Sequence, residues 1–302
     1  FAYHEAMGDA IYIPWCNYSF RWVNQPTSIT LDDNTVVTPP QEGSQGEALE
    51  VRNVRTQQGE NAFIWEWQSM YAVNNTANLI LSLVDDTELS GDAELKRSVF
   101  KAWAYYWKGY AYSRIGSMYT AGLIIDEPGV TNGDFVSNAE VLAEAKVNLD
   151  LAKAELDQIA ADIVPITSNI IPDNLVPSPF RGSAPSSAMS KDAWIRNINT
   201  LLARNILVNT KVADMTAADW NEVFNLTSNG IQASDYVFVM KQDGNNWEVS
   251  TTVNHRLMIG WHFLSERLVQ DFKDGDQRYI DNVTVLSSPE INRAGRGIQY
   301  GT

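Results

Sequence analysis

A long amphipathic stretch over residues 90–119 constrains the fold of this chain more than any other part of the sequence. Its large apolar residues recur at the three- and four-residue spacing of a helix with one buried face: Leu95, Val99, Trp103, Tyr106 and Tyr110. Ser90 and Asp92 are both suited to cap its start, and Gly116 is suited to end it. Aromatic residues also lie off the main face, so we expect a central helix that contacts protein on more than one side.

Helical periodicity returns in four further long stretches, which makes the expected fold mainly α. They cover residues 60–84, 137–163, 190–209 and 216–230. Ser137 or Asn138 is the expected N-cap of the second of these stretches and Thr216 that of the fourth. A short helix is also expected over residues 260–273. Because the link between the first two long helices is short, they should lie antiparallel as a hairpin. We expect Trp67, Trp103 and Trp220 on buried helix faces.

Two asparagines interrupt the apolar face of the helix expected over residues 60–84. Asn74 and Asn78 share that face with large apolar side chains, and a buried amide needs hydrogen-bond partners. We expect those partners to be backbone groups of a neighbouring loop.

Irregular segments flank the helical part of the chain. Residues 13–60 show no sustained period, although ITLDD and TVVT read as strand fragments, and the period of two on either side of DGN predicts a β-hairpin within residues 235–253. No composition shift marks a boundary, so we expect one domain over residues 1–302, in which 1–59 are irregular, 60–230 form helix pairs and 231–302 form a hairpin, a short helix and a loop tail. So long an irregular segment is more often functional than accidental.

Charge and motif content exclude several classes of function. The net charge of -15 argues against nucleic-acid binding and against adsorption to an anionic bilayer. A single cysteine, Cys16, excludes an internal disulfide framework. A membrane-spanning helix needs a run of about 18 apolar residues, and the sequence contains no such run. The three histidines lack metal-site spacing, and no phosphate-binding glycine loop or nucleophile motif is present. We therefore expect no cofactor and assign no metal-binding or catalytic residues from these motifs.

Several segments, taken in order, resemble the SusD/RagB family of outer-membrane nutrient-binding lipoproteins. The segments are WEWQSMYAVNNTANLILSL (65–83), ELKRSVFKAWAYYWKGYAYSRIG (94–116), NLDLAKAEL (148–156), SKDAWIRNINTLLARNIL (190–207), ADWNEVFNLTSNGI (218–231) and LSERLVQDFKDGDQR (264–278). Lys101 stands where the family often has Arg, and the proline that usually follows the helix-ending glycine is missing. The family's later helical segment has no counterpart here, so we expect a fragment or a short member.

The resemblance implies tetratricopeptide-like helix pairs, an α/α superhelix, with irregular loops laid over them. It also implies a protein on the extracellular face of the outer membrane in a Bacteroidetes-type bacterium. Such a protein binds an oligosaccharide or other small nutrient without catalysis and passes it to a SusC-like TonB-dependent transporter. Cys16 lacks the small residues of a lipobox, so the implied lipid anchor lies upstream of Phe1.

Sugar binding needs flat aromatic side chains for the ring faces and polar groups for the hydroxyls. Two irregular segments supply both kinds of side chain, and the predicted binding residues are Trp15, Tyr18, Trp22, Asn17, Arg21, Trp247 and Asn245, with Phe20, Asn24, Gln25, Asp243 and Asn246 beside them. The alternative is that these aromatics only hold loops onto the helices, in a helical-repeat scaffold that binds other proteins. An all-helical glycosidase is a third hypothesis, because carboxylates are plentiful and a glycosidase needs two across a cleft.

Overall fold

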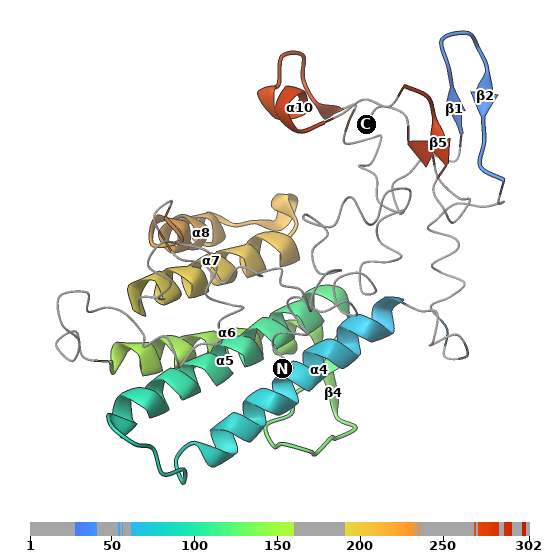
Figure 1. Cartoon of the computed structure of the whole chain (residues 1–302). Helices are drawn as coiled ribbons and strands as arrows, with labels where there is room; N and C mark the ends of the chain where they lie inside the picture. Colours follow the sequence, from blue (N-terminus) through green and yellow to red (C-terminus); the bar gives the residue numbers. More distant parts are fainter. Residues whose placement is uncertain are drawn as a thin grey trace. The chain divides into compact units, whose positions relative to one another are not determined.

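Helices make up most of the described chain (Figure 1). The structure is a computed structural model, and it describes residues 28–40, 54, 56, 62–159, 191–232, 235, 269, 271–283, 287–291 and 298–299. The chain divides into two compact units, one of residues 1–7 and 66–243 and the other of residues 8–65 and 244–302. The mainly α fold with packed helix pairs and small sheets is confirmed, whereas the expectation of one domain stays a prediction.

Helix α5 (Ala93–Met118) is the central element of the first unit, as the sequence predicts. Asp92 caps it, because its side chain accepts a hydrogen bond from the Leu95 N–H at 3.0 Å. The helix continues two residues past Gly116, so the prediction that this glycine ends it is wrong. A Cβ on Gly116 would lie 2.6 Å from Leu142 Cγ of helix α6, which shows that the glycine permits close helix packing instead.

The other long helices lie close to their predicted positions. They are α4 (Ala62–Leu83), α6 (Asn138–Asp157), α7 (Lys191–Asn209) and α8 (Ala217–Ser228). Helices α4 and α5 run antiparallel, as expected of a hairpin (Figure 1). Ser137 and Thr216 cap α6 and α8, each through a capping box, whereas α6 ends about six residues earlier than predicted because the Ile159 N–H turns back to Leu156 O at 3.1 Å.

The described residues form three two-stranded antiparallel sheets. The strand fragments predicted in ITLDD and TVVT are confirmed as β1 (Ile29–Thr30) and β2 (Val36–Val37). The sequence did not predict β3 (Ala121–Leu123) paired with β4 (Phe135–Ser137), β5 (Glu290–Ile291) paired with β6 (Ile298–Gln299), or the short helix α10 (Gln277–Asn282). The predicted hairpin at 235–253 lies outside the described residues apart from Asp235, and so does most of the predicted helix at 260–273.

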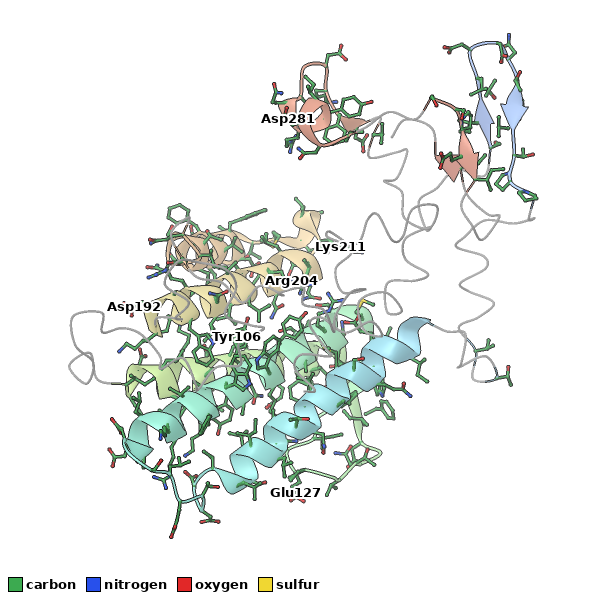
Figure 2. All side chains as sticks on the ribbon, in the orientation of Figure 1. Tyr106, Glu127, Asp192, Arg204, Lys211 and Asp281 are labelled. Carbon is green, nitrogen blue, oxygen red and sulfur yellow. The ribbon has the colours of Figure 1, made fainter. Side chains whose placement is uncertain are left out.

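The core of the first unit lies between α5, α6 and α7. Its large aromatic side chains meet edge to face, with ring centroids 5.5 Å apart for Trp103 and Trp107 and 5.9 Å apart for Trp103 and Trp194. Tyr106 lies among the same side chains between α5 and α7 (Figure 2). The prediction for Trp103 is therefore confirmed.

The prediction for Trp220 is wrong, because this side chain on α8 is 45% exposed. Its neighbour one turn along, Phe224, is 68% exposed, and the buried residue of α8 is Val223. Helix α8 packs on α7 through a stripe too narrow to cover the whole apolar face. Trp67 on α4 is half-buried and lines a cavity, so it is not a core residue either.

Candidate functional site

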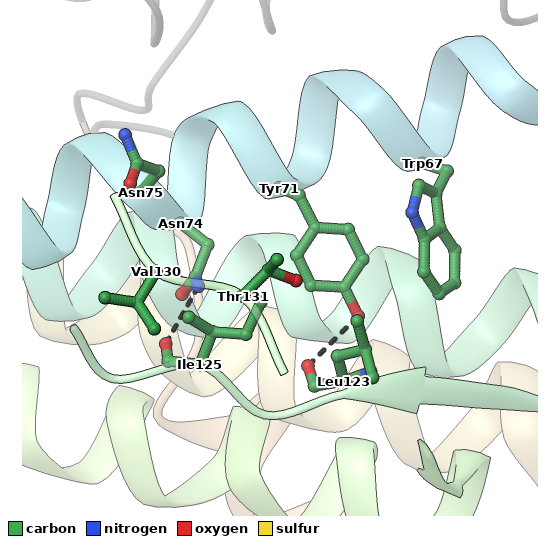
Figure 3. Close-up of a pocket in the computed structure, with 8 residues that line it drawn as sticks. All are labelled: Trp67, Tyr71, Asn74, Asn75, Leu123, Ile125, Val130 and Thr131. Carbon is green, nitrogen blue, oxygen red and sulfur yellow. Dashed lines mark hydrogen bonds between the residues drawn. The ribbon is translucent and has the colours of Figure 1, made fainter. Parts of the chain in front are cut away.

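A cavity of about 200 Å³ lies between α4 and the segment that joins β3 to β4, residues 124–134, here called the connector (Figure 3). Four lining residues come from α4 at helical spacing, so their side chains share one face of the helix. The lining residues are Trp67, Tyr71, Asn74, Asn75, Leu123, Ile125, Val130 and Thr131.

Side chains of α4 hold the backbone where β3 runs into the connector. The Tyr71 hydroxyl accepts a hydrogen bond from the Leu123 N–H at 2.6 Å and donates to Leu123 O at 3.0 Å. The amide nitrogens of Asn74 and Asn78 donate to Ile125 O at 3.0 and 2.7 Å. The expectation that these asparagines bind the backbone of a neighbouring loop is confirmed.

A buried lysine ties the connector to α5 as well. Lys108 is 4% exposed and donates to Asn78 Oδ1 at 2.7 Å and to Asp126 Oδ1 at 2.6 Å, while the Asp126 side chain is 67% exposed. A buried ammonium group is tolerated only when it is paired and hydrogen-bonded. The Lys108 charge is thus committed to positioning the connector.

Asn74 and Asn75 both line the cavity, and they differ in how their side-chain oxygens are hydrogen-bonded. Asn74 is 1% exposed and donates through Nδ2, but its Oδ1 has no hydrogen-bond partner among the described residues. Asn75 uses its Oδ1 to accept from the Gly129 N–H at 2.6 Å. An orphaned buried acceptor costs about 1–3 kcal/mol, so a group that donates to Asn74 would recover stability.

Trp67, which lines the cavity, contacts three other aromatic rings, and we call the four together the aromatic ledge: Trp67, Tyr71, Tyr119 and Phe135. The Trp67 ring centroid lies 4.7 Å from that of Tyr71, 5.1 Å from that of Tyr119 and 6.2 Å from that of Phe135. None of the four is buried, and Phe135 is 63% exposed. Partial burial of the Tyr71 hydroxyl raises its pKa, so the hydroxyl stays a neutral donor and acceptor.

This arrangement can bind a small neutral molecule that has apolar faces and hydroxyl edges. Among the described residues, no three His, Cys, Asp or Glu side chains lie close enough together to hold a metal ion. No helix in the part of the chain that the structure describes is long and apolar enough to cross a membrane.

The residues predicted from the sequence to bind sugar lie outside the described residues, so their roles stay predictions: Trp15, Tyr18, Trp22, Asn17, Arg21, Trp247 and Asn245. Sequence reasoning missed the cavity. The apolar period of α4 predicts Trp67 as a core residue. Nothing in the sequence marks Phe135 as a neighbour of Trp67, because the two residues lie far apart along the chain. In the sequence, the one sign of an unusual helix surface is the pair Asn74 and Asn78 on an otherwise apolar face.

No known family model matches this sequence, and no curated protein matches it. The chain is similar to a solved structure described as a SusD-like carbohydrate-binding protein from Bacteroides vulgatus ATCC 8482. The TM-score is 0.56 at 13% sequence identity, and the match covers 96% of this chain and 60% of that chain. At so low an identity the likeness shows the fold alone. The chain has the SusD-like fold, which confirms the fold that the sequence resemblance implied, and it spans less than two thirds of that protein's length.

Proposed function

We propose that this protein binds oligosaccharides at the bacterial cell surface and delivers them to a SusC-like TonB-dependent transporter in the outer membrane. The observation that carries the proposal is the SusD-like fold over 96% of the chain, shared with a protein described as carbohydrate-binding. A fold alone does not fix a function. The aromatic residues and amides around the cavity give independent chemical support, because these groups suit sugar rings and their hydroxyls.

The proposed binding residues are the loop aromatics and their polar neighbours, Trp15, Tyr18, Trp22, Asn17 and Arg21, together with Trp247 and Asn245. We propose no catalytic role for any of them. The proposed route to the membrane is a lipid anchor upstream of Phe1, and the proposed partner is the transporter. The net charge of -15 supports a neutral ligand over a nucleic acid.

Isothermal titration calorimetry against malto-, cello-, xylo- and manno-oligosaccharides tests the binding proposal. Affinity should be modest, because a site that buries few rings offers little surface to offset the cost of ordering the ligand. Replacing Trp15 and Trp22 by alanine should abolish the heat of binding at an unchanged melting temperature. A panel without any binding, under conditions where the protein is folded, would reject sugar binding.

A protein-interaction scaffold without sugar binding is the second candidate, and the exposed Trp220 and Phe224 on α8 favour it. It predicts no heat with any sugar and a loss of stability, rather than of binding, when Trp15 and Trp22 are replaced. Release of reducing ends from a polysaccharide would instead reveal a glycosidase. Co-purification with a co-expressed SusC-like transporter tests the delivery step, and its absence would restrict the proposal to binding.

A further inference from the structure

The aromatic residues of the first unit fall into two groups that differ in exposure. Trp107, Tyr112 and Trp194 are each 0% exposed and belong to the core. Every ring of the aromatic ledge keeps contact with solvent, and Phe135, at 63% exposed, gains little from burial. The planes of Phe135 and Trp67 are inclined by only 27°. Two nearly parallel rings, the exposed Phe135 and the half-buried Trp67, offer the kind of flat apolar surface that stacks against the C–H face of a sugar.

Polar groups line the cavity beside these rings. Asn74 Oδ1 is an acceptor that has no partner among the described residues, and the Thr131 hydroxyl on the connector both donates and accepts. A sugar hydroxyl also does both, so it satisfies either kind of group. Asn74 Oδ1 is covered, whereas the Thr131 side chain that lines the same cavity is exposed, so Thr131 is the group that a ligand contacts directly (Figure 3).

The size of the cavity limits what it can hold. Its volume of about 200 Å³ is roughly seven times the ~30 Å³ that one water molecule occupies in the liquid. It is also below the ~300–1,000 Å³ of sites that hold a drug-sized ligand. This is space for one sugar ring, with the rest of a chain continuing over the exposed ledge.

The exposed charged side chains of the connector are all acidic. The lining residues of the cavity are uncharged, while the connector carries Asp126, Glu127 and Asp134 and no lysine or arginine. Glu127 is exposed (Figure 2). Lys108, which contacts Asp126, is buried and already hydrogen-bonded. Like charges repel, and salt screens that repulsion over ~8 Å under physiological conditions, so acidic side chains on a segment that lines the cavity should disfavour a carboxylated or sulfated sugar.

We infer that the aromatic ledge and the cavity beside α4 form a subsite for one neutral sugar residue of a glycan, in which Phe135 and Trp67 stack against the ring and the polar side chains that line the cavity contact its hydroxyls. The inference rests on the proposed function and adds a location and a ligand class to it. The bland alternative is that these rings only pack the β3–β4 sheet onto α4.

The test compares two exposed phenylalanines by calorimetry with a neutral oligosaccharide from the panel that binds the wild-type protein. Phe135→Ala should weaken binding about threefold to tenfold, the range expected for one aromatic contact. Phe224→Ala is the matched control, because Phe224 is 68% exposed and lies on α8; it should leave the affinity unchanged. Both variants should keep the wild-type melting temperature, since both side chains are already exposed.

Charge selectivity is tested with the uronic-acid counterpart of the same oligosaccharide. It should bind more weakly than the neutral sugar, and the double variant Glu127→Gln and Asp134→Asn should narrow the difference. Equal or tighter binding of the uronate would overturn the charge assignment. If Phe135→Ala binds as the wild type does while the Trp15 and Trp22 variants lose binding, the subsite is rejected and the proposed function stands. If the wild type binds no member of the panel, both are rejected.

Discussion

Replacing Tyr71 by phenylalanine should loosen the connector more than the same replacement at Tyr112. The Tyr71 hydroxyl accepts a hydrogen bond from the Leu123 N–H at 2.6 Å and donates one to Leu123 O at 3.0 Å. The Tyr112 hydroxyl likewise accepts from the Ile125 N–H at 2.9 Å and donates to Ile125 O at 3.1 Å. Both substitutions remove one oxygen and leave the ring in place. Differences in core packing therefore cancel in the comparison.

The two variants differ in the backbone groups that they leave without partners. Hydrogen-bonded pairs alternate along an antiparallel ladder, and the Asn138 N–H donates to Thr120 O, so the N–H and C=O of Leu123 point away from β4. Leu123 is 8% exposed and would lose both partners in Tyr71→Phe. In Tyr112→Phe, Ile125 O keeps its two asparagine donors and only the Ile125 N–H is orphaned.

An unsatisfied buried polar group costs about 1–3 kcal/mol, so we expect about 2–4 kcal/mol for Tyr71→Phe and about 1–2 kcal/mol for Tyr112→Phe. The rate of amide hydrogen exchange, measured by mass spectrometry on a peptide spanning residues 121–126, reports the loss of local stability in each variant. The midpoints of these ranges differ by about 1.5 kcal/mol, and 1.4 kcal/mol is a factor of ten, so Tyr71→Phe should accelerate exchange there about tenfold more than Tyr112→Phe does. Equal acceleration in the two variants would refute the reasoning.

Gly109→Ala should destabilise the protein by about 1–3 kcal/mol through overpacking, because the new Cβ would lie 2.7 Å from Leu149 Cγ. A thermal scan should show a lower melting temperature for this variant. Gly133→Ala is the control and should keep the wild-type melting temperature, because a Cβ there meets nothing within 4 Å. The hydrogen bond from the Arg196 guanidinium holds the pKa of Asp235 below its usual value. Stability from this pair is complete above the unfolded carboxyl's pKa of ~4 and is lost as the pH falls through the lower folded value. Asp235→Asn should therefore flatten the fall in melting temperature between about pH 5 and pH 2, and an unchanged slope would contradict this assignment.

The candidate site could be predicted only in part. The apolar period placed Asn74 and Asn78 on an inward face, and the rule that buried amides are hydrogen-bonded gave their backbone partners correctly. Neither the connector that accepts those bonds nor Phe135 beside Trp67 had a signal in the sequence. Lys108, which also holds the connector, lies on another helix, and contacts between distant segments leave no periodic pattern.

The sequence by itself determined where the long helices lie and where three of them begin. Asp92, Ser137 and Thr216 act within a single turn, and apolar periodicity is a property of neighbouring residues, so both can be read locally. Only the tertiary structure decided which faces are covered. Trp220 follows the apolar period and is exposed, whereas Trp107 lies off the main face of its helix and is completely buried. The reason is that burial depends on what packs against a face, and the partners of α5 and α8 come from other parts of the chain.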